Sequence, residues 1–397
     1  MSTMQVHDRV ILLFFLLIGL FAFIGASLAP LAPLLMAELH LDYEVTAYHF
    51  TASSLGVISA GATGERIISL LGRQRALWIG AAGVCCGVLL FINGKTPTLT
   101  IPSIFLIGSF GSLIGQTSDT VISEQLGEKR AVVFTEANVI CSLCASLAPL
   151  AIGACVGAGL GWRVALCTTV ALYAISYLLF RRIAIPGQTE HHAQHAMKGT
   201  LPFPYWAYWV VILLSCAAEW SIVDWSAAFL KDVAHFLPKD AATSVTAFFA
   251  AMITARIIGS ALSRWVSVHV LLPITAVFGL CGFFVFWLGP AGWVNLVGLF
   301  LTGFGIANIY PYTLAAALGV APSQSALAAS RMNIATGASG LFGPMALGCL
   351  AKQFGIFKAY AVAPMLLTLA LVTILIANAT AKRHKAEKPE QPSARPH

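Results

Sequence analysis

Charged side chains are scarce in this sequence: Asp, Glu, Lys and Arg make up 10% of its 397 residues, whereas they make up about 25% of a typical soluble domain. Hydrophobic residues account for 58%, and the mean hydropathy is +0.83. This leaves too little polar surface to coat a soluble protein of this size. The apolar segments are continuous runs of about 20 residues, not alternating segments of about 10, which excludes a transmembrane β-barrel. The composition therefore predicts an all-α membrane protein.

Several chemical signatures are also missing. The sequence has no phosphate-binding glycine loop, no nucleophile elbow and no clustered His and Asp metal ligands, so we expect neither an ATP-driven pump nor an enzyme. All nine cysteines lie in apolar segments and are interpreted as free thiols, including the CxxC pair of Cys141 and Cys144. The net charge of +7 is interpreted as a feature of membrane topology, because the motifs of RNA-binding proteins are absent. We expect no cofactor, no metal and no nucleic-acid partner.

About twelve apolar spans are present, each long enough to cross about 30 Å of hydrocarbon. We place them at 10–37, 46–70, 76–94, 100–124, 132–157, 162–181, 205–232, 241–263, 267–288, 292–315, 326–351 and 358–379. The spans predict an N-terminal six-helix half at 1–182, a linker at 183–204, a C-terminal six-helix half at 205–380 and a polar, disordered tail at 381–397. The linker holds His191, His192 and His195, for which a solvated segment is favoured over a metal site.

Basic residues predict the orientation of the chain. Of the 23 Lys and Arg residues, 17 fall on alternate turns and both termini, and six fall on the other side. Because Lys and Arg accumulate in cytoplasmic loops, this bias places both termini and the linker in the cytoplasm. We expect a multi-pass protein of the cell membrane, which in a bacterium is the inner membrane.

The two halves share an internal repeat with an offset of 195 residues. The matching pairs are Pro149 and Pro344, Gly153 and Gly348, Gly64 and Gly259, Gly108 and Gly303, and Asn138 and Asn333. One offset that aligns several spans without gaps indicates a duplication. Halves of parallel topology are expected to be related by an axis along the membrane normal.

With this layout the chain resembles the major facilitator superfamily over essentially its full length. The turn after span eight reads Gly259-Ser-Ala-Leu-Ser263-Arg264, similar to the family pattern G-x-x-x-D-R but with Ser for Asp. The turn after span two is a second degenerate copy, with Glu65 and Arg66 in these places. The resemblance implies a transporter that works by alternating access, in which two six-helix halves rock about a site at the membrane midplane.

Three segments resemble the fucose-permease-like, sugar-type branch more narrowly. GQTSDTVISEQLGEKR at 115–130 resembles the span-four motif of that branch, with Ser123 where Asn is usual. EWSIVDWSAAFLKD at 219–232 resembles its span-seven motif, and GFGIANIYP at 303–311 resembles its span-ten motif. Membership of the branch does not define a substrate.

Three carboxylates lie where hydrocarbon is expected. Glu219 and Asp224 are in the apolar run that begins near Tyr205, and Asp119 is in span four. Ionisable groups inside a membrane are costly and usually face the bundle interior or a wet cavity. A carboxyl group in such a medium can bind and release a proton, so these three residues are the proton-coupling candidates. Proton-coupled sugar carriers, which the chain resembles, use a carboxylate in span four. Helix packing is the alternative for Asp119 and Asp224.

A midplane site also needs hydrogen-bonding and stacking groups. The substrate-binding candidates are Gln116, Asn138, Trp220, Trp225, Asn308, Tyr310 and Asn333. The alternative for each Asn is a packing hydrogen bond between helices, worth about 0.6 kcal/mol.

Four charges at the cytoplasmic ends of spans suggest a gate. We expect two ion pairs, Glu65–Arg331 and Glu136–Arg256, to form in the outward-open state and to break in the inward-open state. The alternative is that each Arg extends to the lipid headgroups.

The sequence therefore predicts a monomeric secondary transporter of a small polar organic solute, with sugars among the candidates. It would be driven by proton symport, and its partners would be the solute, the proton and the membrane lipid. A proton-coupled exporter or antiporter of a drug-like or metabolite solute is the first alternative. A non-transporting membrane sensor is the second.

Overall fold

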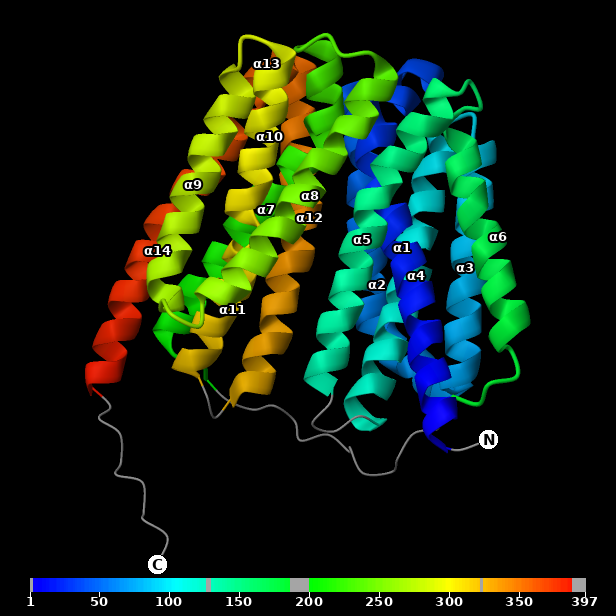
Figure 1. Cartoon of the computed structure of the whole chain (residues 1–397), viewed down its shortest axis with the longest axis horizontal. Coiled ribbons are helices and arrows are strands. Elements are labelled where there is room, and N and C mark those ends of the chain that lie inside the picture. The colour runs from blue at the N-terminus through cyan, green and yellow to red at the C-terminus, as the bar shows by residue number, and fades with distance from the viewer. Residues whose placement is uncertain (1–2, 126–129, 186–199, 322–323, 388–397) are drawn as a thin grey trace, which may run out of the picture.

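The computed structural model describes residues 3–125, 130–185, 200–321 and 324–387, and within these ranges every regular element is a helix. The first half contains α1 (Thr3–Leu39), α2 (Tyr43–Leu71), α3 (Arg73–Asn93), α4 (Pro97–Gln125), α5 (Arg130–Gly157) and α6 (Trp162–Phe180). The second half contains α7 (Phe203–Asp232), α8 (Pro238–Leu262), α9 (Val268–Leu288), α10 (Gly292–Ile306), α11 (Ile309–Val320), α12 (Ser325–Phe354), α13 (Ile356–Ala359) and α14 (Val362–Glu387). The halves stand side by side (Figure 1).

Eleven helical segments of the described chain are long and apolar enough to cross a membrane, which confirms the predicted all-helical membrane fold. The pair α10 and α11 forms one of them, and α13 with α14 forms another. The predicted second span, α2, falls short in hydropathy, not in length: its 29 residues extend about 43 Å. Helix α2 packs against α4 in its own half and against α12 in the other half, so much of its surface faces protein. Helix α14 continues to Glu387, beyond the residue at which we placed the end of the second half.

The tenth span is broken, where we expected one continuous helix at 292–315. Helix α10 ends at Ile306 and α11 begins at Ile309. Pro311 follows the break, and it has no N–H to donate to the carbonyl group of Ala307 four residues earlier. The side chain of Asn308 anchors the backbone at this point, because its amide donates to the carbonyl oxygen of Ala255 at 2.7 Å. The break is therefore held against α8.

The repeat is visible in the helix packing. A methyl group on Gly108 of α4 would lie 2.5 Å from the carbonyl oxygen of Ser53 on α2. The same group on Gly303 of α10 would lie 2.6 Å from the carbonyl oxygen of Phe248 on α8. Gly303 and Phe248 lie 195 positions after Gly108 and Ser53, respectively. The two halves therefore use the same close helix crossing, at positions where only a glycine fits.

The halves are in contact at one end of the molecule and separated at the other (Figure 1). We call the end with α13 the closed end, and the end where α1 begins and α14 ends the terminal end. At the closed end Lys352 of α12 contacts Asp42 at 3.0 Å and Glu44 at 2.6 Å. The hydroxyl group of Tyr43 donates to Asp232 of α7. These polar contacts connect the two halves above their apolar interface.

Two glycines mark the closest approach of the halves at the closed end. A methyl group on Gly348 of α12 would lie 2.5 Å from Cβ of Ala47 and 2.9 Å from the carbonyl oxygen of Tyr43, both on α2 of the other half. A methyl group on Gly153 of α5 would collide with the Thr243 side chain of α8. Gly153 and Gly348 are the repeat-related pair of the sequence, so the duplication supplies both closing contacts.

Candidate functional site

Glu219 lies near the middle of α7, 16 residues after Phe203 and 13 before Asp232. Its side chain is half-buried. The titratable groups that interact with it are the Cys216 thiol on the same helix and the Arg256 guanidinium on α8, and the Tyr310 hydroxyl of α11 lies near Cys216. The carboxylate predicted to carry a proton is therefore placed at mid-depth, beside a cation.

Arg256 extends from α8 across the interface between the halves. Its Nη1 donates to Oγ of Ser142 on α5 at 3.2 Å. Ser142 is 12 residues into the 28-residue helix α5, so the guanidinium reaches the middle of that helix. The Arg256 side chain is exposed, not packed into the core of its own half. It is close enough to Glu219 for the two charges to interact.

The other two predicted carboxylates lie apart from this pair. Asp119 on α4 is exposed and lies near Cys141, the neighbour of Ser142 on α5. Asp224 is buried in α7, five residues closer to the closed end than Glu219, and its charge is near Tyr360. Asp119 thus shares the depth of the Arg256 contact, whereas Asp224 is on the closed side of it.

The predicted substrate-binding residues divide into accessible and packed groups. Trp220 is 40% exposed and lies near Gly340 of α12, and Tyr310 is half-buried. Trp225 is fully buried at the closed end, where Nε1 donates to the carbonyl oxygen of Pro344 at 3.0 Å. Asn308 is buried and bonded to the α8 backbone, as described above. Trp220 and Tyr310 are thus the accessible aromatic members of the predicted set.

The remaining amide candidates are on three different helices. The Gln116 side chain fills the space beside Gly64, where a methyl group would collide with it, and its Nε2 donates to Ser112 Oγ at 3.3 Å. Asn138 is exposed on α5, one turn before Ser142. Asn333 belongs to α12, but its side chain lies outside the described residues.

The helices expected to carry the gate are neighbours, because α2 packs against α12 and α5 against α8. Glu65 and Glu136 are exposed, and Arg331 is half-buried with its guanidinium 5.4 Å from the centre of the Trp206 ring. Neither predicted pair is among the ion pairs that the described residues form. The two pairs were expected to be broken in an inward-open state, so they stay a prediction.

The ion pairs that do connect the halves were missed from the sequence. Lys352 is in the last turn of α12, and Asp42 and Glu44 flank the start of α2. The available signal was the placement of opposite charges at the ends of two spans that face each other in this fold. Asp42 also caps α2 by accepting a hydrogen bond from the Val45 amide at 2.8 Å. That bond, together with Lys352, holds the pKa of Asp42 below its usual range.

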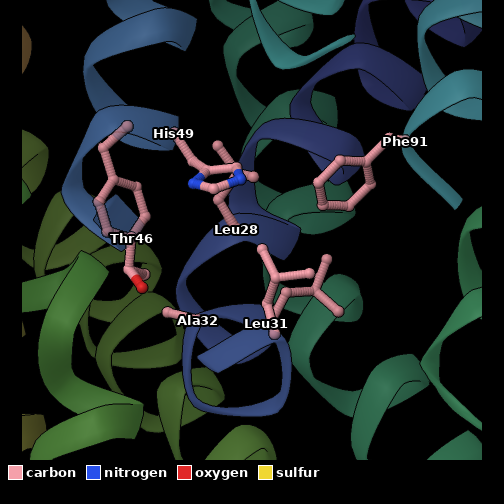
Figure 2. Close-up of a pocket in the computed structure, with 8 residues that line it drawn as sticks. Leu28, Leu31, Ala32, Thr46, His49 and Phe91 are labelled. Carbon is pink, nitrogen blue, oxygen red and sulfur yellow. The ribbon is translucent and has the colours of Figure 1, made fainter. Parts of the chain in front are cut away.

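A small apolar pocket is located within the first half, away from these residues. It is lined by Leu28, Leu31, Ala32, Thr46, His49 and Phe91, among others (Figure 2). Both ring nitrogens of His49 have partners, the Val45 carbonyl oxygen at 3.1 Å and Thr100 Oγ1 at 2.8 Å. Its hydrocarbon lining and its satisfied histidine make this pocket a packing defect rather than a site for a polar solute. Among the residues that the structure describes, no three His, Cys, Asp or Glu side chains are grouped as a metal site requires.

Comparison with known proteins identifies the family. The model of the Major Facilitator Superfamily matches residues 14–323. The chain belongs to this superfamily of membrane transporters, so it is a transporter and not an enzyme. An uncharacterized MFS-type transporter of Yersinia pestis is 24% identical over 360 residues, which cover 87% of this chain and 90% of that protein. An uncharacterized transporter of Sinorhizobium fredii is 35% identical over 148 residues, which cover 36% of this chain and 38% of that protein.

Solved structures share the fold. A bacterial homolog of the human lysosomal transporter Spinster, in an inward-facing and occupied conformation, superposes with a TM-score of 0.77 at 12% identity. That alignment covers 99% of this chain and 100% of the homolog. A mutant of the nucleoside transporter NupG superposes with a TM-score of 0.75 at 17% identity, covering 93% of this chain and 99% of NupG. The family model thus confirms the superfamily resemblance read from the sequence, and the solved structures show the same fold.

Proposed function

We propose that this transporter carries a small polar organic solute together with a proton, by alternating access of its two halves. The observation that carries the proposal is Glu219, a half-buried carboxyl group at mid-depth on α7 beside the cation Arg256. A carboxyl group in this setting changes protonation in response to neighbouring charge, which is the property that proton coupling needs. Trp220 and Tyr310 supply stacking and hydrogen-bonding groups at the same depth.

The closed end faces the outside of the cell, and the terminal end faces the cytoplasm. The excess of Lys and Arg on the terminal side supports this orientation. With this orientation, the conformation in Figure 1 is inward-facing, because the halves are in contact on the outer side. The superposition on an inward-facing transporter supports the same assignment. The segments at 115–130, 219–232 and 303–311 support a place in the fucose-permease-like branch.

The test uses purified protein in liposomes that contain a pH-sensitive dye. An inward solute gradient is imposed for pools of sugars, amino acids, nucleosides and organic acids. Symport predicts acidification that follows the solute gradient. Glu219→Gln should abolish this acidification, and Asp224→Asn tests whether the buried carboxyl group of α7 is also needed for it. Proton release in the opposite sense to solute entry would make the protein an antiporter. Solute exchange without any proton flux would refute proton coupling.

A further inference from the structure

The charges at mid-depth indicate which kind of solute this site accepts. A cation inside a membrane protein is expensive, and it is retained where it has a partner or a task. Arg256 has five N–H donors. Among the described residues, its one hydrogen-bond acceptor is the neutral hydroxyl oxygen of Ser142. The hydrogen-bonding capacity of this guanidinium therefore exceeds what the described residues around it use.

Glu219 does not occupy that capacity. Its charge interacts with Arg256, but no direct ion pair between them is among those that the described residues form. Arg256 instead extends from the second half to α5 of the first half. This places an exposed guanidinium between the halves, with a carboxyl group nearby but not bonded to it.

We propose, resting on the symport function above, that Arg256 binds the carboxylate of a hydroxylated monocarboxylic acid and that Glu219 carries the co-transported proton. A guanidinium matches a carboxylate in geometry and binds it through two parallel hydrogen bonds. Trp220 and Tyr310 flank the same depth and contact the remainder of the solute. The Ser142 hydroxyl group is displaced from Arg256 when the solute binds.

The same arrangement couples the proton to the solute. A solute carboxylate on Arg256 brings a second negative charge close to Glu219, and like charges favour protonation of the carboxyl group. Cys216 interacts with Glu219, and Tyr310 lies near Cys216; a thiol and a phenol are ordinarily neutral at pH 7. One proton therefore binds to Glu219 as one anion binds to Arg256, and both leave on the other side. The transported charge is zero.

The experiment uses the full chain in liposomes with an internal pH dye, and two probes that differ in one functional group. Glucose is neutral, and gluconate carries the carboxylate; glucuronate and lactate extend the panel, and protein-free liposomes control for leak. We expect acidification with at least one carboxylate and none with glucose. A potential imposed with potassium and valinomycin should leave the rate unchanged, because an electroneutral cycle moves no net charge.

Variants separate the roles of the two charges. Arg256→Gln should lower counterflow of the labelled carboxylate about 100-fold, as expected when one partner of a buried charge pair is lost. Arg256→Lys keeps the charge but loses the two parallel hydrogen bonds, so it should retain only part of the wild-type counterflow. Glu219→Gln should retain counterflow and lose acidification. Arg182→Gln is the matched control, since Arg182 is an exposed residue just after α6, a helix that does not pack closely against α8.

The outcomes are distinguishable. Acidification with glucose that survives in Arg256→Gln would overturn the anion site and leave the symport function intact. Carboxylate counterflow without proton movement would overturn the coupling on which both proposals rest. Carboxylate transport that responds to the imposed potential would overturn the one-to-one pairing. No counterflow of gluconate, glucuronate or lactate would overturn the proposed solute class.

Discussion

Alanine in place of Gly348 should hold the two halves apart at the closed end. The added methyl group would lie 2.5 Å from Cβ of Ala47, 2.9 Å from Cζ2 of Trp225 and 2.9 Å from the carbonyl oxygen of Tyr43. Carbon atoms in contact are about 3.5–4.0 Å apart. All three neighbours belong to backbone or to buried side chains, so the methyl group cannot be accommodated by a rotamer change. Helix α12 must move away from α2 and α7.

The size of the effect follows from the cost of overpacking. Adding a methyl group to a well-packed interface costs about 1–3 kcal/mol. The contacts with Ala47 and Tyr43 cross between the halves and exist only while the closed end is closed, whereas the contact with Trp225 lies within the second half. Most of this cost should therefore fall on one conformation. A difference of this size shifts the ratio of the two conformations roughly 5–150-fold. The protein should remain folded, since the opposite conformation relieves the contacts with Ala47 and Tyr43.

The assay is labelling of one cysteine by a membrane-impermeant maleimide added at the closed end. The reporter is Thr246→Cys, in a chain whose native cysteines are replaced. Thr246 of α8 is half-buried and donates to the Ser146 carbonyl oxygen of α5 at 3.4 Å, on the other side of the interface from Gly348. Gly348→Ala should raise its labelling rate at least about fivefold. Gly25→Ala should not, because nothing lies within 4 Å of a methyl group there. An unchanged rate in folded protein would refute rigid-body opening limited by this contact.

The same labelling assay tests the other polar contacts. Lys352→Met should raise the rate several-fold, and Glu44→Gln should raise it less, because Asp42 still contacts Lys352; an unchanged rate in Lys352→Met would mean that these ion pairs do not hold the closed end. The pKa of Asp42 is depressed in the folded protein. The stability that its charge contributes is therefore fully present above the unfolded pKa of about 3.9, and it is lost only as the pH falls through the lower folded pKa. Asp42→Asn should therefore lower the thermal midpoint equally at pH 5.5 and pH 8, and a difference between the two would contradict this. Glu65→Arg with Arg331→Glu should transport better than either single variant, and equal activity would exclude that pair as a gate.

Much of the architecture could be predicted because it depends on hydropathy and on a repeat. The spans follow from continuous apolar runs, and the offset of 195 reappears as the Gly108–Ser53 and Gly303–Phe248 contacts. The break before α11 had a local signal in Pro311. That signal is ambiguous, because Pro149 and Pro344 lie inside unbroken helices.

The site could be predicted only in part, because side-chain partners depend on how helices from different halves meet. Arg256 was paired with Glu136 from helix adjacency, and α5 and α8 do adjoin. The contact that forms is with Ser142, six residues further along α5. Asn308 has the residue type of a binding group, but it holds the α10–α11 break. Lys352 was missed because a charge at the end of a span has no visible partner until the halves are assembled.

The polarity of α2 has a consequence for how the chain enters the membrane. A helix is admitted to the bilayer largely on its own hydrophobicity, and α2 does not reach the level of the other spans. Its predecessor α1 is the opposite case, with a mean hydropathy of 2.8. We infer that α2 enters as the second arm of a hairpin led by α1. It is then retained by α4, against which it packs closely. In a ribosome-bound chain that ends before α4, α2 should therefore enter with α1 but should not be held stably in the bilayer.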